Sequence, residues 1–275
     1  MIKSSKLKNF KIFQTETKFT LASINLLTGI NGRGKSSFLQ SILLLSQSIE
    51  DKQTLCKIAF NGSAVNLGTF RDVQNRSTAN INPIEISHET LNGPLNLLLE
   101  RDEHDDTIGV INTPISQGIL NEFQHIHYIA ADRVGPQEFY IKSTLPRFIT
   151  VGTKGEFLGN VLYQKKGQIV YEPLQKIGVG SSNELEIKTG EWLSYILNTE
   201  NIKVFAENPE SSRIITLSFG IGSSKFRPHN IGFGYSYVLP IVLSGLIAQV
   251  NIPVQTEPLI PDQTEPLISA KCATC

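Results

Sequence analysis

One stretch of eight residues has the residue types needed to hold a triphosphate group. Gly29–Ser36 follows the pattern G-x-x-x-x-G-K-[ST] at every fixed position. In such a loop the glycines let consecutive backbone N–H groups turn inward around phosphate oxygens, and the next helix presents its positive N-terminal end to the same anion. Lys35 supplies a mobile positive charge, and the Ser36 hydroxyl is suited to ligate Mg²⁺. We call Gly29–Ser36 the phosphate loop.

The segments on either side of the phosphate loop have the patterns expected of a strand and a helix. The apolar residues before it, Ile24, Leu26 and Leu27, predict a strand. After the loop the period changes, and apolar residues recur at spacings of three and four at Phe38, Ile42, Leu45 and Ile49. This period predicts a half-buried helix over 35–49, so the sequence meets the strand–loop–helix requirement of the motif.

A second glycine-containing turn lies near the end of the chain. Gly232, Gly234 and Ser236 precede a helical pattern that begins at Tyr237. Small residues that allow close backbone approach, a hydroxyl group and a helix N-terminus would suit contact with a γ-phosphate. A plain glycine turn before a core helix is the alternative interpretation.

Elsewhere the chain alternates between strand and helix patterns. Residues 2–27 predict two or three strands, and a charged turn at Arg101–Asp106 separates strands at 95–99 and 108–111. A buried strand is predicted at 126–131 and a short helix at 191–197. Strands at 202–206 and 214–219 predict a hairpin around Asn208. The acidic turn could bind a metal ion, although a solvated hairpin tip is the favoured interpretation.

Five segments together resemble the ABC-type ATPases of the SMC and RecF kind, and more narrowly the bacterial AAA family ATPases of unassigned role. They are Leu7–Phe13, Gly29–Ser37, Leu67–Val73, Tyr128–Pro136 and Asn230–Ile241. The resemblance implies an α/β fold of the P-loop NTPase type, with a mixed sheet, a β-rich N-terminal part and an incomplete C-terminus. It covers residues 1–250, as one partial ATP-binding domain with an irregular insertion at about 137–215.

The resemblance implies ATP and Mg²⁺ as cofactors, and a homodimer or a partner that completes the ATPase. In ABC-type ATPases the nucleotide lies between the phosphate loop of one protomer and a signature helix N-terminus of the other. The expected ATP-binding residues are Gly29, Asn31, Gly32, Arg33, Gly34, Lys35, Ser36 and Ser37, with Ser36 as the Mg²⁺ ligand. Gly232, Gly234 and Ser236 are expected to form the signature-like turn.

Hydrolysis requires groups that the sequence does not supply in the expected order. The resemblance implies that a Walker B strand ending in Asp, a water-positioning Glu and a switch histidine follow the signature helix. After residue 250 the only acidic residues are Glu257, Asp262 and Glu265, each within two residues of a proline, and His229 is the last histidine. The chain is therefore expected to stop before its catalytic half, as a truncation or frameshift would produce.

Other carboxylates and polar residues are weaker candidates for the missing roles. Ala206–Glu210 resembles a Walker B ending but precedes the signature-like turn, so a hairpin turn is favoured. Asp132 follows an apolar run and is a second Walker B candidate. Asp72 or Gln74 could sense Mg²⁺ and the γ-phosphate.

The last 25 residues differ in composition from the rest of the chain. The hexapeptide QTEPLI occurs at Gln255–Ile260 and again at Gln263–Ile268. A short exact repeat with a proline in each copy cannot form a central strand or a long helix. We therefore predict a disordered tail over 251–275. The C-x-x-C pair at its end, Cys272 and Cys275, has no second pair to complete a zinc site.

Composition limits the remaining possibilities. The 25 basic and 25 acidic residues give no net charge, so binding to nucleic acid or anionic lipid must depend on a local patch. Nucleic acid stays a possible partner through the lysines near the N-terminus, although a solvated strand edge also explains them. The longest apolar run, Val238–Val250, is shorter than a membrane-spanning helix. Three cysteines and no signal-peptide pattern predict a cytoplasmic protein.

The expected function is ATP binding in DNA transactions or phage defence, without hydrolysis by this chain. The alternative is a degenerate gene product, either a non-catalytic interaction protein or a gene fragment.

Overall fold

The structure, a computed structural model, divides the chain into two compact units. It describes residues 2–49, 55–78, 82–115, 117–145, 148–177, 182–248 and 254–256. Unit 1 comprises residues 1–126 with 258–275, and unit 2 comprises residues 127–257. The sequence patterns did not indicate a boundary at 126/127, and each unit is described by itself.

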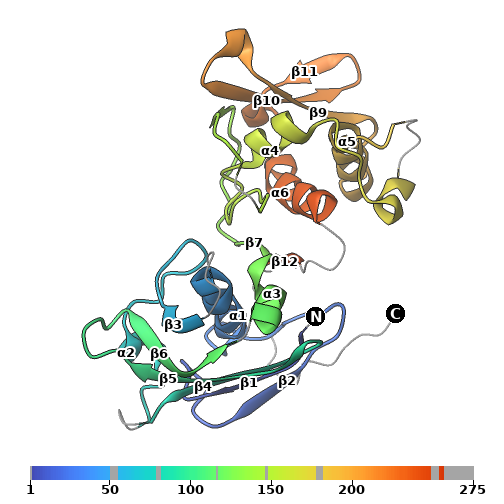
Figure 1. The fold of residues 1–275 in the computed structure, drawn as a ribbon. Helices are drawn as coiled ribbons and strands as arrows, with labels where there is room; N and C mark the ends of the chain where they lie inside the picture. Colours follow the sequence, from blue (N-terminus) through green and yellow to red (C-terminus); the bar gives the residue numbers. More distant parts are fainter. Residues whose placement is uncertain are drawn as a thin grey trace. The chain divides into compact units, whose positions relative to one another are not determined.

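Unit 1 is built on a six-stranded sheet in which every pair of neighbours is antiparallel (Figure 1). Antiparallel neighbours can be joined by short turns, which suits the hairpins that the sequence predicts here. In spatial order the strands are β2 (Thr17–Thr20), β1 (Ile2–Lys8), β4 (Ile84–Thr90), β5 (Gly93–Arg101), β6 (Ile108–Ile115) and β3 (Leu55–Ala59).

Alternating residues of this sheet face the core of unit 1. On β5 the buried side chains are Leu95, Leu97 and Leu99. Successive side chains of a strand point to opposite faces, so a spacing of two gives one apolar face. Two helices, α1 (Lys35–Ile49) and α3 (Gln117–Gln124), lie on the same side of the sheet (Figure 1).

Helix α1 confirms the helix predicted over 35–49. Its buried residues include the four that defined the pattern, Phe38, Ile42, Leu45 and Ile49. The helix buries more than one narrow stripe, because Leu43 and Leu44 are also 1% exposed. A short helix, α2 (Phe70–Val73), lies within the segment that links β3 to β4.

The predicted strand before the phosphate loop is wrong. No strand forms in the described residues just before the loop, and Ile24 and Leu26 are 80% and 75% exposed. Instead, the Asn25 side chain accepts a hydrogen bond from the Ala22 N–H (2.9 Å) and donates one to the Ala22 carbonyl (2.8 Å). Asparagine side chains that bond nearby backbone compete with the ladder of a sheet. Two of the three apolar residues that predict the strand, Ile24 and Leu26, are therefore exposed to solvent.

Unit 2 has a smaller antiparallel sheet. Its strands are β8 (Phe139–Ile141), β9 (Ile202–Glu207), β10 (Ile214–Ile221) and β11 (Ser224–Phe226), and all of the other three pair with β10. The pairing of β9 with β10 confirms the predicted hairpin, with the short 3₁₀ turn Pro209–Ser211 between them.

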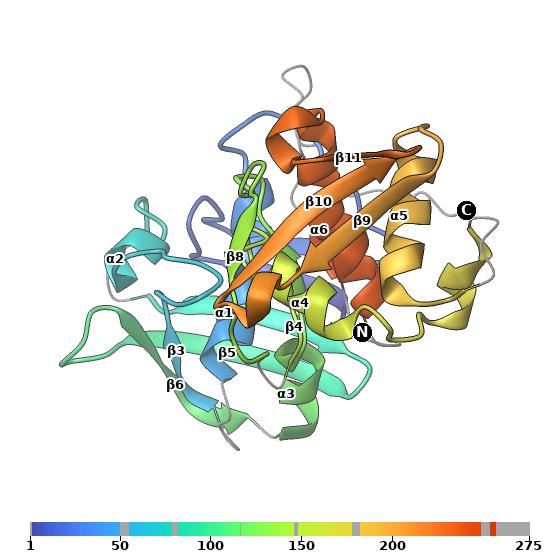
Figure 2. The same cartoon turned by 90° about the horizontal axis from the view of Figure 1, so that it is seen from above.

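Helices α4 (Leu158–Lys165), α5 (Leu185–Ile196) and α6 (Phe233–Ile247) lie on one side of this sheet (Figure 1 and Figure 2). Helix α5 begins before the helix predicted at 191–197, and α6 contains the predicted helix after Ser236. Two further 3₁₀ turns are Glu172–Lys176 and Pro228–Asn230. The segment interpreted as an irregular insertion, about 137–215, therefore includes two helices and two complete strands.

Three residues of the predicted disordered tail form a strand. β12 (Val254–Thr256) pairs in parallel with β7 (His127–Ile129), which is shorter than the strand predicted at 126–131. The interval between Pro253 and Pro258 in the sequence keeps the backbone N–H groups that a short strand needs. The rest of the predicted tail, 251–253 and 257–275, lies outside the described residues, as do Cys272 and Cys275.

The fold is mixed α/β. The expected mixed sheet is not formed among the described residues, because the two larger sheets are antiparallel and the parallel β7–β12 pair stands as a separate sheet. Among the same residues, no helix has both the length and the apolar character needed to cross a membrane.

Candidate phosphate-binding loop

The three glycines of the phosphate loop adopt backbone conformations that favour glycine. The φ angles are 133° at Gly29, 78° at Gly32 and 97° at Gly34. Side chains with a Cβ strongly disfavour positive φ, so the loop requires glycine at these three positions. The turn from Asn31 to Gly34 leads directly into α1. A helix N-terminus leaves its first N–H groups without partners inside the helix, so they remain available to an anion.

The Lys35 side chain bends back over the phosphate loop. Its Nζ donates hydrogen bonds to the Gly29 carbonyl and, at 3.1 Å, to the Ile30 carbonyl. The Lys35 ammonium group therefore lies against the phosphate loop, beside the start of α1. A positive charge held beside N–H groups of a helix N-terminus favours binding of a negatively charged group such as phosphate.

A layer of aromatic side chains supports the phosphate loop. The rings of Phe13 and Phe19 meet edge to face at 5.6 Å between centroids, and those of Phe19 and Phe38 are 4.5 Å apart. Phe13 also contacts the loop, because a Cβ on Gly34 would lie 2.6 Å from the Phe13 Cζ atom. The layer connects β2, the segment after β1 and α1. The sequence analysis did not predict this aromatic layer, because the positions of Phe13 and Phe19 relative to the loop follow no local pattern.

The predicted binding residues differ in exposure. Those with exposed side chains or backbone are Asn31, Gly32, Arg33 and Ser36, whereas Gly29, Gly34 and Ser37 are buried and Lys35 is intermediate. Ser37 is 9% exposed, so its side chain is largely buried. The exposed Ser36 hydroxyl remains suited to ligate Mg²⁺.

The second glycine turn lies in unit 2, at the start of α6. Gly232 and Gly234 are exposed there, but Ser236 is 7% exposed and points into the unit. Its Oγ atom has no hydrogen-bond partner among the described residues. A Cβ on Gly232 or Gly234 would meet only ordinary contacts, at 3.9 Å and 4.0 Å. Packing within the unit therefore does not require glycine at either position.

The Walker B candidates Asp132 and Glu207 are both in ion pairs on the surface of unit 2. Asp132 pairs with Lys154, and this hydrogen bond lowers the pKa of the carboxyl group. Glu207 lies 2.7 Å from the Lys225 Nζ atom, at the end of β9. These contacts favour the hairpin interpretation for Ala206–Glu210 and give Asp132 a surface role.

Asp72 and Gln74 have structural partners in unit 1. The Asp72 carboxylate accepts hydrogen bonds from the Thr69 N–H (2.9 Å) and the Thr69 hydroxyl (2.8 Å), which lower its pKa. Gln74 is 5% exposed, and its amide donates to the Asn82 carbonyl at 2.8 Å. Asp72 thus caps the start of α2 through one carboxylate oxygen, and Gln74 ties the end of α2 to the segment before β4.

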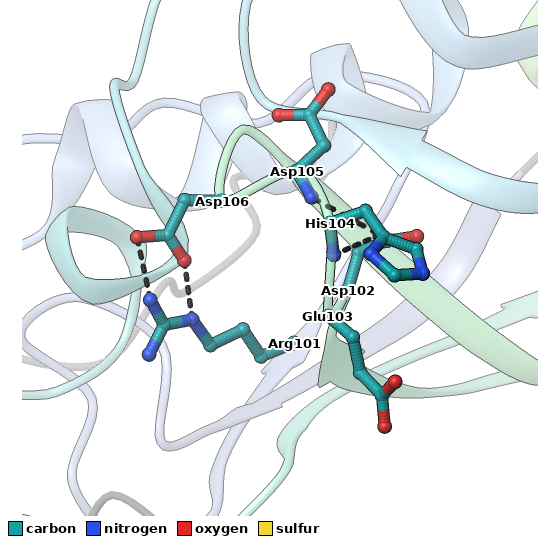
Figure 3. Close-up of a pocket in the computed structure, with 6 residues that line it drawn as sticks. All are labelled: Arg101, Asp102, Glu103, His104, Asp105 and Asp106. Carbon is teal, nitrogen blue, oxygen red and sulfur yellow. Dashed lines mark hydrogen bonds and ion pairs between the residues drawn. The ribbon is translucent and has the colours of Figure 1, made fainter.

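The charged turn after β5 forms a hairpin tip around a concavity of about 530 Å³ (Figure 3). Arg101 pairs with Asp106, and Asp102 accepts hydrogen bonds from the backbone of His104 and Asp105. Lys57 donates to Asp102 at 2.6 Å and, with those backbone donors, lowers the pKa of Asp102 to about 2. No cluster of metal-binding side chains occurs in the part of the chain that the structure describes. The turn fits the favoured hairpin-tip interpretation.

Three of the five lysines in the first 20 residues are in ion pairs or partly buried. Lys6 and Lys8 form ion pairs with Glu16 (3.2 Å) and Glu85 (2.8 Å). Partial burial lowers the pKa of Lys11. Neutralised or buried lysines contribute little to binding a nucleic-acid backbone. Lys3 and Lys18 are exposed, so two of the five lysines remain accessible in this segment.

Comparison with known proteins adds no family assignment. No protein-family model matches the chain, and no curated protein matches it. The class that the geometry defines is a two-unit α/β chain with antiparallel sheets and a glycine loop at the start of a long helix.

Proposed function

We propose that the phosphate loop binds the triphosphate of ATP together with Mg²⁺. The observation that carries the proposal is the conformation of the loop, in which glycines 29, 32 and 34 have positive φ and Lys35 folds back over it. The available donors are backbone N–H groups, an ammonium group and a hydroxyl group, the set that phosphate and Mg²⁺ require. Uncharged ligands would leave the Lys35 charge without a counter-charge.

The fit of the donor set is local to the phosphate loop. A Cβ on Gly32 would meet no atom within 4 Å, so space remains beside the exposed tip of the loop. Lys35 would exchange its bonds to two carbonyl groups for bonds to phosphate oxygens, which are stronger because both partners are charged. Ser36 would hold Mg²⁺, which supplies positive charge against the β- and γ-phosphates.

We further propose that this chain binds ATP without hydrolysing it, as a member of the ABC/SMC-like ATPases that acts in DNA transactions or phage defence. Asp132, Glu207 and Asp72 each direct one carboxylate oxygen to a neighbour within their own unit, Lys154, Lys225 and Thr69 respectively. A carboxylate that positions water needs a free oxygen aimed at the nucleotide. A separate polypeptide would supply the catalytic groups.

The exposed glycines of α6 support an assembly of two copies. Nothing within unit 2 requires the missing side chains of Gly232 and Gly234. Two glycines at an exposed helix N-terminus allow the backbone there to approach a ligand held by another molecule, beside the exposed Phe233 ring. The alternative, a degenerate gene product that is a non-catalytic interaction protein or a gene fragment, predicts no effect of these glycines on assembly.

Titration with a fluorescent ATP analogue tests the proposal. We expect Mg²⁺-dependent binding that Lys35→Ala weakens at least about tenfold, since hydrogen bonds to charged groups contribute about 1.5–3 kcal/mol each. Lys18→Ala removes a lysine of the same unit that lies outside the loop, and it should bind as the wild type does. Equal affinities of Lys35→Ala and wild type would reject the proposal.

Phosphate release and molecular mass separate the remaining alternatives. We expect no release above background from the chain alone, and a shift to a dimer with Mg·ATP that Gly234→Trp prevents. Release that Lys35→Ala abolishes would show that the chain supplies its own catalytic groups. A wild type that binds no nucleotide would favour the non-catalytic interaction protein.

A further inference from the structure

We propose that Phe13 is a positioning residue of the phosphate loop, and this inference rests on the proposed function. The Cζ end of its ring points at Gly34. A Cβ on Gly34 would lie 2.6 Å from Cζ, 3.1 Å from Cε1 and 3.4 Å from Cε2 of Phe13. The ring occupies the volume that any side chain at position 34 would need, and it limits the movement of the Gly34 backbone.

The segment that carries Phe13 is itself fixed by the backbone. Phe10 and Phe13 exchange two hydrogen bonds, of 3.2 Å and 2.8 Å, which close a tight turn. Lys11 within the turn has a φ of 48°, and Asn9 before it has a φ of 55°. Asparagine adopts such angles readily, but a lysine holds one only where its surroundings favour it. The backbone that carries the Phe13 ring is therefore held in one conformation by this turn.

The turn is tied to the C-terminal end of α2. The Lys11 N–H donates to the Val73 carbonyl at 2.7 Å, and the Asn75 side-chain amide donates to the Lys11 carbonyl at 2.6 Å. The Asn75 N–H donates to the Asn9 carbonyl at 3.1 Å. Three hydrogen bonds thus connect this turn to a segment more than 60 residues later in the chain.

The other side of the Phe13 ring is supported from α1. Phe19 packs against Phe13 and against Phe38, and Phe38 lies in the first turn of α1, just after the loop. The Phe38 N–H also donates to the Gly34 carbonyl at 2.9 Å. Two contacts therefore restrain Gly34: the Phe13 ring and the hydrogen bond from the first turn of α1.

This support matters because a loop rich in glycine has high backbone freedom. Glycine loses more conformational freedom on ordering than any other residue, and ordering on binding reduces affinity. A residue that orders Gly34 in advance removes part of that cost. Loss of the contact should weaken binding about tenfold, the factor that corresponds to ordering the backbone of one residue.

The experiment compares Phe13→Leu with Phe60→Leu. Phe60 is fully buried in unit 1, whereas Phe13 is 9% exposed, and the Phe60 ring packs against Phe70, with 5.9 Å between centroids. Below the thermal transition of both variants, we expect Phe13→Leu to bind the Mg·ATP analogue about tenfold more weakly than wild type. Phe60→Leu should keep the wild-type affinity. Hydrogen exchange of the peptide over 29–36 should be faster in Phe13→Leu only.

Phe13→Tyr provides a second variant that keeps the ring. It preserves packing against Phe19 but adds an oxygen to Cζ, the atom nearest Gly34. We expect weaker binding and altered exchange over 29–36 with little change elsewhere. Equal affinities of Phe13→Tyr and Phe60→Leu, with wild-type exchange over the loop, would overturn the inference. If the wild type does not bind nucleotide, the proposed function fails, while the exchange data still decide whether Phe13 orders the loop.

Discussion

Two alanine substitutions in the phosphate loop differ in what the new methyl group meets. At Gly32 a Cβ would have no atom within 4 Å, whereas at Gly34 it would overlap the ring of Phe13. Both positions have positive φ, at 78° and 97°, so both substitutions place a Cβ in a disfavoured conformation. Gly32→Ala therefore serves as the matched control for Gly34→Ala.

The expected magnitudes follow from these two contributions. A left-handed conformation costs a residue with a Cβ about 1–2 kcal/mol, and this is the expected loss of stability for Gly32→Ala. Overpacking adds about 1–3 kcal/mol where side chains must move, so Gly34→Ala should lose roughly 2–5 kcal/mol. The 2.6 Å approach to Cζ is too short for any real Cβ, so the ring of Phe13 must shift.

The assay is urea unfolding followed by two probes. Far-UV circular dichroism reports on both units, and the emission of Trp192, the single tryptophan, reports on unit 2. We expect the substitutions to lower the free energy of unfolding of unit 1 without moving the Trp192 transition. The double variant Phe13→Leu with Gly34→Ala should lose less than the sum of the two single variants, because the shorter side chain makes room for the methyl group.

Equal destabilisation by Gly32→Ala and Gly34→Ala would refute the reasoning. It would mean that the Phe13 ring does not occupy the space beside Gly34. Additive losses in the double variant would lead to the same conclusion, because two groups in contact should show an interaction energy.

Two other predictions concern parts of the chain away from the loop. Burial lowers the pKa of His88 to about 3, from 6.5 in an unfolded chain, so its neutral form stabilises the fold above pH 6.5 and this contribution falls as pH drops toward 3. Between pH 7.5 and pH 5 we expect a loss of about 2 kcal/mol in urea unfolding, much reduced in His88→Gln; an identical pH dependence in both proteins would contradict this. Gln255→Pro removes an N–H from the centre of β12, opposite Tyr128, and should speed hydrogen exchange over 127–129, whereas Gln255→Thr should not. Unchanged exchange in the proline variant would rule out the β7–β12 pairing.

The features that the sequence predicted well depend on neighbours along the chain. Phe38, Ile42 and Leu45 define α1 by their spacing alone, and the β9–β10 hairpin needs only two short strands and a turn. Pattern reasoning failed where partners are distant. The apolar residues before the phosphate loop predict a strand, but a strand needs a neighbour to pair with, and periodicity carries no information about that neighbour.

The candidate site divides in the same way. The G-x-x-x-x-G-K-[ST] spacing identified the loop and the positions of its glycines, because each glycine reflects a local backbone angle. The contact between Phe13 and Gly34 could not be predicted, since it depends on a turn held by Val73 and Asn75. The boundary between the two units is equally non-local, because it reflects which segments pack together.

The absence of the predicted strand changes which residues must hold the phosphate loop in place. A strand would fix the start of the loop through its ladder, but here the preceding residues are exposed and turn around Asn25. The end of the loop is fixed by α1, through the Phe38 N–H and the Gly34 carbonyl. The remaining restraint comes from the aromatic layer, so the order of this loop should depend on Phe13 more strongly than in a loop that follows a paired strand. On this argument, affinity for the triphosphate and stability of the aromatic layer should change together, while the two antiparallel sheets stay intact.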